Sequence, residues 1–568
     1  MRRPFPALLV SIALLAACQP ATPVSPPTPA TGDGPYDLII ANGRLVDGTG
    51  SAWFYGDVAV RGDRIARIAP RGVLSRGARS TRVIDARGLV VAPGFIDIQG
   101  QSDGELTIGD GRVVSKVTQG ITTEIMGEGG SPAPTNLKTH PRGAGRADLD
   151  FSGERGFDAW LRAMERHGVS ENVGSFLGAG TVRVYAKGEA RGPATAAELD
   201  TMRAVVRRAM RDGAFGVGSA LIYPPGNFAS TEELIEIAKA MAPFGGVYIT
   251  HMRSEGNAWL EAIDEAIRIG QDGGVPVEIF HLKAGGKRNW EKTPLAFAKI
   301  DSARATGLDV QANMYAYTAG ATGLTACLPP WASADGKLFE NIVNPEIRAR
   351  ISGEMDRVQS EWENLCELGG PEGVLFLQLE KPDNQRFAGK RLSDVAAMTG
   401  KNWKEAAMDL IASERSRVET VFFLMSEENV RAKLRQPWMK FGTDAKGHDP
   451  ERPEGLTHPR GYGNYPRILG KYVREEKVLT LEEAIHKMTG AVATRLSIAD
   501  RGLLRPGFYA DITIFDPATV ADRATFERPH QLSVGIKWVF VNGVAVVVDG
   551  AHTGAKPGRA VRGPGYLP

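Results

Sequence analysis

Two short apolar stretches decide the fold: Gly246-Val247-Tyr248-Ile249-Thr250-His251 and Val275-Pro276-Val277-Glu278-Ile279-Phe280-His281. Each is rich in residues that favour strands, and each ends in a histidine. In a parallel β/α barrel the chemistry sits at the carboxyl ends of the strands, so a histidine there is a better candidate metal ligand than one on a helix. The alternative for His251 and His281 is a partly buried histidine hydrogen-bonded to the backbone.

Strands and helices alternate around these stretches, from about residue 92 to about residue 490. Repeated βα units of this length indicate an α/β fold, a (β/α)8 TIM-like barrel. The interval 332–416 is too long for one connection, so we expect an insertion there, with an amphipathic helix over 342–362. The other predicted barrel strands are 89–97, 121–126, 174–177, 216–222, 308–313, 421–424 and 439–443.

Short alternating strands flank the barrel on both sides in sequence. They lie in residues 36–91 and again in residues 491–568, where the turn Val541-Asn542-Gly543 is typical of a hairpin. The run 89–97 is continuously apolar, as in a strand buried on both faces. We expect the two terminal segments to form one small composite β-sandwich domain beside the barrel.

The first 35 residues are not expected to belong to the folded part. Arg2 and Arg3, followed by the short apolar run 7–17, have the layout of an export signal over residues 1–18. The signal ends in Leu15-Ala16-Ala17-Cys18, which resembles the lipobox of bacterial lipoproteins, and residues 19–35 form a Pro/Thr/Ala-rich tether. We expect an exported protein, lipid-anchored at Cys18 on the periplasmic face. A cleaved signal that leaves a soluble periplasmic protein is the alternative.

Composition excludes several classes of partner. The formal net charge of the 568 residues is +2 with both signs interspersed, which predicts no surface for nucleic acid or for an anionic membrane. Beyond Cys18 only Cys327 and Cys366 remain, so a disulfide framework is excluded, although one bridge can form. We therefore expect a small-molecule substrate and predict no protein partner.

Several separate runs form a combined pattern: Val91-Ala92-Pro93-Gly94-Phe95-Ile96-Asp97, Val117-Thr118-Gln119-Gly120-Ile121-Thr122-Thr123, Leu221-Ile222-Tyr223-Pro224-Pro225-Gly226, His251-Met252-Arg253, His281-Leu282-Lys283 and Thr457-His458-Pro459-Arg460. Together they resemble the amidohydrolase superfamily and, within it, the N-acyl-D-amino-acid deacylase (D-aminoacylase) family. The resemblance covers nearly all of the chain after the tether.

The sequence also departs from the family. Gln99 and Gln101 stand where the superfamily usually ends its first barrel strand with His-x-His, and an amide oxygen is a poor ligand for zinc. The metal-binding Cys of the family falls on Glu128 or on Gly129, depending on the position of a gap, and only Glu128 can coordinate. The alternative for Glu128 is a buried carboxylate paired with Arg or Lys. Ala179 replaces a further histidine of the family.

The resemblance implies a role for each remaining candidate. His251 and His281 with Glu128 would hold one Zn²⁺, and Asp444 would take a proton from the metal-activated water, unless it only caps a turn. Cations suit a substrate carboxylate because guanidinium and ammonium groups donate charged hydrogen bonds to it. The candidates for substrate binding are Lys283, Arg460, Tyr315, Tyr317 and Tyr223, with packing at the barrel rim as the alternative for the tyrosines. His458 is expected to support the neighbouring loop.

The expected function is metal-dependent hydrolysis of a linear amide next to a carboxylate, most simply an N-acyl-D-amino acid. One alternative is an amidohydrolase for another C–N bond, in a dipeptide or a cyclic amide, because fold does not determine substrate. The other is a degenerate barrel that binds a ligand without turnover, since histidines are missing at Gln99, Gln101 and Ala179.

Overall fold

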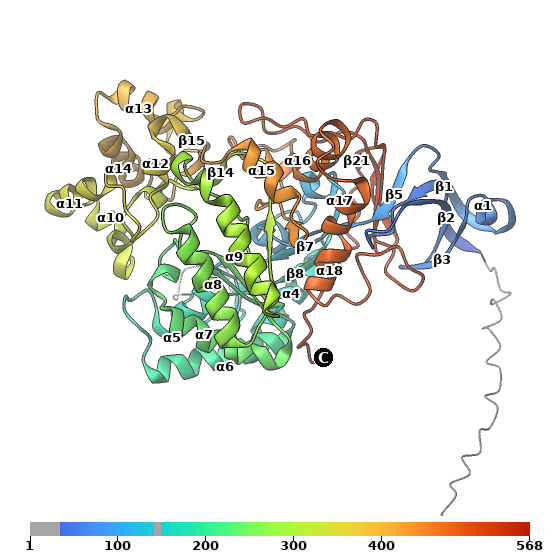
Figure 1. Ribbon diagram of the computed structural model, residues 1–568, viewed down its shortest axis with the longest axis horizontal. Coiled ribbons are helices and arrows are strands. Elements are labelled where there is room, and N and C mark those ends of the chain that lie inside the picture. Colours follow the sequence, from blue (N-terminus) through green and yellow to red (C-terminus); the bar gives the residue numbers. More distant parts are fainter. Residues whose placement is uncertain (1–34, 141–148) are drawn as a thin grey trace, which may run out of the picture.

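The computed structural model describes residues 35–140 and 149–568. The predicted signal, residues 1–18, and residues 19–34 of the predicted tether lie outside this range. Figure 1 shows three parts: a central barrel, a β domain on one side and a helical insertion on the other. No helix in the described part of the chain is long and apolar enough to cross a membrane.

Parallel strands close into the barrel, and in the described chain they occupy eight positions. β8 and β9 share the third position, because β8 pairs with β7 while β9 pairs with β10. The barrel closes between the last and first strands, where Asp444 N donates to Gln99 O over 2.8 Å. The strands are β6 (Phe95–Asp97), β7 (Ile121–Met126), β8 (Asn172–Ser175), β9 (Leu177–Gly178), β10 (Gly216–Ala220), β11 (Val247–His251), β12 (Val277–Ile279), β13 (Val310–Met314) and β17 (Met439–Phe441).

Amphipathic helices cover the outside of the barrel. In α8 the buried residues Trp259, Ala262, Ile263, Ala266 and Ile269 recur every three or four positions, so one stripe faces the strands. The helices that follow the strands are α2 (Asp103–Thr107), α3 (Val114–Val117), α4 (Gly156–His167), α5 (Ala179–Lys187), α6 (Ala196–Asp212), α7 (Thr231–Met241), α8 (Trp259–Gly273), α9 (Thr293–Ala305), α15 (Glu427–Leu434), α16 (Arg460–Arg467), α17 (Leu481–Met488) and α18 (Gly490–Arg495).

The two terminal segments share one sheet, which has nine strands in the described residues. Its two halves join where β5 pairs antiparallel with β18, so N-terminal and C-terminal colours lie side by side in Figure 1. The strands are β1 (Tyr36–Leu45), β2 (Phe54–Arg61), β3 (Arg64–Pro70), β4 (Ser80–Asp85), β5 (Val90–Pro93), β18 (Ile512–Phe515), β19 (Ile536–Val541), β20 (Val544–Val548) and β21 (Ala551–His552), with the short helix α1 (Val73–Gly77) at the edge. The predicted barrel and composite β domain are both present.

The predicted strand 89–97 is wrong as a single element. It splits at Gly94 into β5 of the β domain and β6 of the barrel. A Cβ on Gly94 would lie 2.1 Å from Thr122 Oγ1, so only glycine fits at this junction. At the other end α18 extends past the expected boundary at residue 491, yet its Val492 and the following Leu496 belong to one hydrophobic cluster with Ile96 and Phe280 of the barrel.

The insertion between β13 and β17 has its own sheet and hydrophobic core. Its sheet contains β14 (Gly320–Gly323), β15 (Val374–Phe376) and β16 (Glu419–Phe422), and its helices are α10 (Leu338–Asn341), α11 (Pro345–Met355), α12 (Leu365–Gly369), α13 (Leu392–Thr399) and α14 (Trp403–Glu414). Cys327 and Cys366 form a disulfide within this part.

Two predictions for the insertion need correction. The segment 421–424 is not a barrel strand, because β16 pairs antiparallel with β14 and β15 in the small sheet of the insertion. The predicted helix 342–362 is shorter: α11 begins after Asn344, whose side chain accepts from the backbone of the first turn, and ends at Met355.

Candidate metal centre and active site

The carboxyl ends of three barrel strands bring a carboxylate and two imidazoles together. Glu128 follows β7, His251 ends β11 and His281 follows β12. One oxygen, Glu128 Oε1, lies 3.1 Å from His251 Nδ1 and 3.0 Å from His281 Nε2. β11 and β12 are adjacent parallel strands, so their terminal histidines meet at the same rim of the barrel.

This cluster fits a divalent metal ion. One ligand atom from each of the three residues lies within 4.8 Å of the others. Ligands of a tetrahedral zinc ion, with bonds of about 2.0–2.1 Å, stand about 3.3 Å apart, which is close to the observed spacing. His251 presents Nδ1 to Glu128, while its buried Nε2 lies on the side of Glu255 and makes no hydrogen bond within the described structure. The donor set, two imidazole nitrogens and a carboxylate oxygen, is one that zinc prefers.

A second carboxylate, which the sequence analysis missed, supports the cluster from behind. Glu255 Oε1 lies 2.9 Å from His281 Nδ1, and Glu255 Oε2 lies 3.6 Å from His251 Nε2. Lys283 Nζ lies 2.6 Å from Glu255 Oε2. A hydrogen bond from Nδ1 to Glu255 leaves the lone pair of His281 Nε2 directed toward Glu128, as metal-binding histidines require. Its position four residues after the strand-end histidine was the available signal.

The charges around the cluster favour the binding of a cation. Burial opposes the ionised form of Glu128, but the charge of His281 and hydrogen bonds from both histidines hold the pKa of Glu128 well below its usual range. Burial and Lys283 favour neutral His281, yet Glu255 and Glu128 raise the pKa of His281 to about 9. Burial lowers the pKa of His251. Two carboxylates therefore surround His281 in a desolvated site that favours a cation.

The other half of the barrel mouth contains amides in place of imidazoles. Gln99 Nε2 donates to Glu128 Oε2 over 2.7 Å, and Gln101 Nε2 lies 3.1 Å from the same oxygen. Gln101 Nε2 also donates to Asp444 Oδ1 over 2.7 Å. Gln101 thus connects Glu128 with Asp444 through hydrogen bonds, whereas the Gln99 amide bonds to Glu128 alone.

Asp444 follows β17 and lines a cavity that Glu128, His251 and His281 also line. Burial raises the pKa of Asp444 to about 6, against the lowering effect of Arg460. Arg460 Nη1 lies 2.7 Å from Asp444 Oδ2. The backbone of Asp444 has φ 50° and that of His281 has φ 34°, so both lie in the left-handed region that such residues adopt at a cost.

The tyrosines divide into two groups. Tyr315 lines the cavity, and its hydroxyl is buried without a hydrogen-bond partner among the described residues, so it can donate to a ligand. Tyr223 also lines the cavity and donates to Thr322 Oγ1 over 2.8 Å. Tyr317 lies apart from them: its hydroxyl donates to Asp522 Oδ2 over 3.3 Å, and it is not among the residues that line the cavity, so its role in substrate binding stays a prediction.

The cations also differ in position. Lys283 lines the cavity, a space of about 190 Å³ that Glu128, His251 and His281 share. Arg460 lies behind it, with its guanidinium 4.5 Å from the centre of the Tyr315 ring. His458 Nδ1 accepts from Arg460 N over 3.0 Å, and its Nε2 lies 2.9 Å from Ala319 O, so it holds the loop that carries Arg460.

The barrel, its composite β domain and the strand-end ligands define a hydrolase of the amidohydrolase superfamily. Residues 419–550 match the model of the amidohydrolase family. The chain is 36% identical to the D-aminoacylase of Alcaligenes xylosoxydans xylosoxydans over 534 residues, which is 93% of this chain and 98% of that protein.

Solved structures agree with this match. One is a D-aminoacylase whose binuclear metal centre shows one-metal activation and second-metal attenuation (34% identity, TM-score 0.76). Another is the N-acyl-D-glutamate deacylase of Bordetella bronchiseptica, complexed with zinc and a phosphonate inhibitor that mimics the tetrahedral intermediate (30% identity, TM-score 0.75). Each match covers 93% of this chain and 100% of the other.

The chain therefore belongs to the D-aminoacylase family of the amidohydrolases. It is a metal-dependent hydrolase of carbon–nitrogen bonds, and the family, the fold and the enzymatic class predicted from the sequence are confirmed.

Proposed function

We propose that this protein is a zinc-dependent deacylase of N-acyl-D-amino acids, with one zinc ion per chain. One observation carries the proposal: Glu128, His251 and His281 converge within 4.8 Å in the cavity that also holds Asp444, Lys283 and Tyr315. Zinc and a D-amino-acid substrate are further supported by the relatives, one of which is a zinc complex of an N-acyl-D-glutamate deacylase.

Glu128, His251 and His281 would hold the ion, with Glu255 orienting His281. When bound, zinc would polarise the scissile carbonyl and lower the pKa of the attacking water. Overall, the C–N bond breaks, the oxygen of water joins the acyl carbon, and the amine leaves with an added proton. The products are a carboxylic acid and a D-amino acid.

Asp444 is the group proposed to move the proton. It is buried at the cavity wall, and the pKa of about 6 allows it to accept a proton near neutral pH and to return it. Gln101 holds Asp444 Oδ1 and Arg460 lies at Asp444 Oδ2, so the carboxylate is oriented from both sides. It would take the proton of water and deliver it to the leaving nitrogen.

The free carboxylate of the substrate would bind at the Lys283 end of the cavity. Lys283 supplies a charge, and Tyr315 supplies a hydroxyl without a partner in the described structure. Burial raises the pKa of Tyr315, so the hydroxyl remains a donor. Arg460, stacked on the ring of Tyr315, would add its charge from behind.

We further propose that the protein is exported and lipid-anchored at Cys18. The support is the lipobox-like run Leu15-Ala16-Ala17-Cys18 after an apolar segment. These residues lie outside the described part of the chain. Replacement of Cys18 by Ser should release the protein from the membrane fraction; an unchanged fractionation would contradict the anchor.

The decisive test measures metal content and activity together. The purified protein is assayed for zinc and for hydrolysis of N-acetyl-D- and N-acetyl-L-forms of alanine, leucine, aspartate and glutamate. We expect about one zinc per chain and hydrolysis confined to D-forms. A protein that binds no metal and stays inactive on the whole panel after zinc is added would overturn the proposal. Activity on dipeptides or cyclic amides alone would replace it with another amidohydrolase activity.

A further inference from the structure

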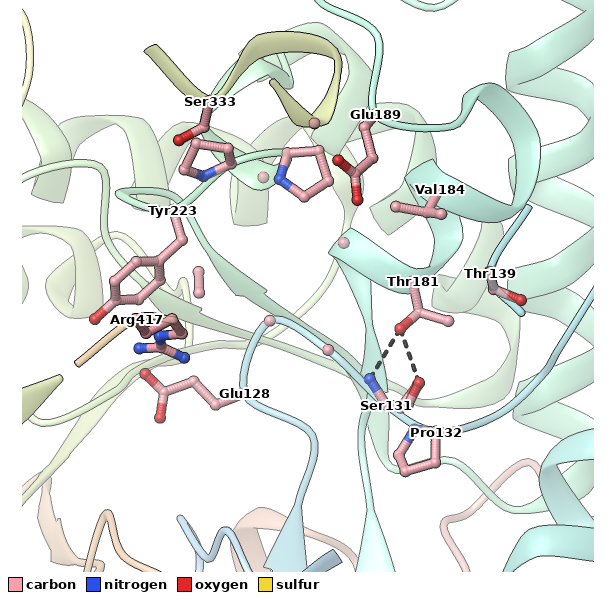
Figure 2. A pocket seen from close by; sticks show the side chains of 18 of the residues that line it. Glu128, Ser131, Pro132, Thr139, Thr181, Val184, Glu189, Tyr223, Ser333 and Arg417 are labelled. Carbon is pink, nitrogen blue, oxygen red and sulfur yellow. Dashed lines mark hydrogen bonds between the residues drawn. The ribbon is translucent and has the colours of Figure 1, made fainter. Parts of the chain in front are cut away.

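A second, larger cavity opens directly from the candidate active site. Its volume is about 920 Å³, against about 190 Å³ for the cavity that contains the histidines. Figure 2 shows Glu128, Tyr223 and Arg417 together on one side of it, with Thr181 and Val184 on the other. The two cavities meet at residues that line both: Glu128, Ala220, Ile222, Tyr223, Glu363 and Arg417.

The wall of the larger cavity combines apolar side chains with polar groups, several of which are hydrogen-bonded within the protein. Thr181 Oγ1 accepts from Ser131 N and donates to Ser131 O, both over 2.9 Å. Arg417 and Tyr223 both bond to Thr322 Oγ1, over 2.7 Å and 2.8 Å. A ligand therefore meets mainly apolar surface, which is contributed by Ile108, Phe151, Val184, Leu328, Leu338 and Phe339.

The residues that line each cavity indicate how a substrate would lie across the two cavities. Lys283, Tyr315 and Asp444 line only the smaller cavity, which places the substrate carboxylate there. Glu128, a proposed metal ligand, lines both cavities, so the proposed reaction would place the scissile carbonyl where the two cavities meet. The part of the substrate on the far side of that carbonyl from the carboxylate is the acyl chain. That chain is consequently the part directed into the larger cavity.

We propose that the larger cavity binds a long apolar acyl chain, so that the preferred substrates are N-acyl-D-amino acids with acyl groups of about eight carbons or more. This inference rests on the proposed deacylase function and names its substrate class. An acetyl group would leave most of the 920 Å³ to water. A longer chain would displace that water and bury apolar surface, which is favourable and proportional to the area removed from water.

The test compares chain lengths in the zinc-loaded full-length protein. N-acetyl, N-octanoyl and N-lauroyl derivatives of D-alanine, D-leucine, D-aspartate and D-glutamate are assayed for kcat/KM. Each buried methylene is worth about a fourfold gain, so an octanoyl chain with only about half of its added methylenes buried should exceed acetyl by about 60-fold. Equal rates for acetyl and octanoyl substrates would overturn the acyl assignment and leave the deacylase function standing.

Two further outcomes are distinguishable. If kcat/KM of the acetyl substrates rises with side-chain size and is indifferent to acyl length, the cavity binds the side chain, and the acyl assignment is wrong. If no derivative of any length is hydrolysed, the proposed function itself fails, and the inference that rests on it fails too.

A pocket-filling variant provides the structural control. Gly130 lines the cavity, and a Cβ added there meets nothing within 4 Å. In Gly130→Phe we expect the ratio of octanoyl to acetyl kcat/KM to fall at least tenfold. Ala326→Phe, at a cavity-lining position contributed by the insertion, should act in the same direction if Gly130→Phe does not fold. Gly353→Phe on α11, also open around its Cβ and outside both cavities, should keep the wild-type ratio. An unchanged ratio in both folded cavity variants would overturn the proposal.

Discussion

The two halves of the barrel mouth both consist of strand ends, but one half carries histidines and the other carries glutamines. At β11 and β12, His251 and His281 are backed by Glu255 and face Glu128. Across the mouth, Gln99 and Gln101 donate amide hydrogens to carboxylates. An unprotonated imidazole nitrogen can coordinate a metal, whereas an amide N–H group donates a hydrogen bond to a carboxylate oxygen. The difference teaches that one rim can bring candidate metal ligands together on one side and provide hydrogen bonds to the remaining carboxylate oxygens from the other.

Removal of one imidazole from the histidine half of the mouth should abolish metal binding. In His281→Ala the ion would lose one of three protein ligands, so we expect bound zinc and kcat/KM both to fall below about 1% of wild type. Metal analysis after gel filtration measures the first and steady-state kinetics the second. His167→Ala, at the end of α4 and away from the mouth, is the matched control. Full zinc content in His281→Ala would remove that histidine from the site.

Replacing the proposed base should separate chemistry from metal binding. Asp444→Asn keeps the shape but cannot accept the proton, so kcat should fall by about 10²- to 10⁴-fold while zinc stays bound. Asp522→Asn, which alters a carboxylate next to Arg467, serves as the control. Wild-type turnover in Asp444→Asn would contradict its role.

The support behind the histidines should have a smaller effect. Glu255→Gln retains the volume but weakens the orientation of His281, so zinc affinity should drop by about 10- to 100-fold. Competition with a chelator measures the change. Glu265→Gln on α8, which disturbs the ion pair of Glu265 with Arg253, is the control. Equal affinities of Glu255→Gln and wild type would show that the carboxylate does not act on the metal.

A substitution in the glutamine half of the mouth should have the smallest effect on activity. Gln101→Ala removes two hydrogen bonds, to Glu128 and to Asp444, so kcat should fall about tenfold, with the zinc content still one per chain. Metal analysis and kinetics on the same preparation test both statements. Two zinc ions per wild-type chain would contradict the proposed difference between the two halves, because the glutamine half would then also bind metal.

Sequence reasoning succeeded where a local pattern is sufficient. An apolar strand that ends in a histidine positions the side chain at the barrel rim, whatever the rest of the chain does. Because β11 and β12 are consecutive and parallel, His251 and His281 were expected near each other, and the structure places them there. Glu128 follows β7 in the same way.

Sequence reasoning failed where the outcome depends on a partner distant in sequence. The run 421–424 has the composition of a barrel strand, but its hydrogen-bond partners are the insertion strands β14 and β15. Tyr315 and Tyr317 were predicted for the same role, and only the structure separates their positions: Tyr315 lines the cavity, whereas the hydroxyl of Tyr317 donates to Asp522. Composition does not specify which surface a segment meets.

The sequence by itself determined the barrel, the composite β domain and the strand-end histidines, because the period of apolar residues and the residue at each strand end are local properties. Only the tertiary structure decided that Glu255 backs His281, that Gln101 joins Glu128 to Asp444, and that the reaction cavity opens into a larger apolar one. Those features depend on loops from separate strands that approach within a few ångströms, and such distances are set by packing of the whole barrel.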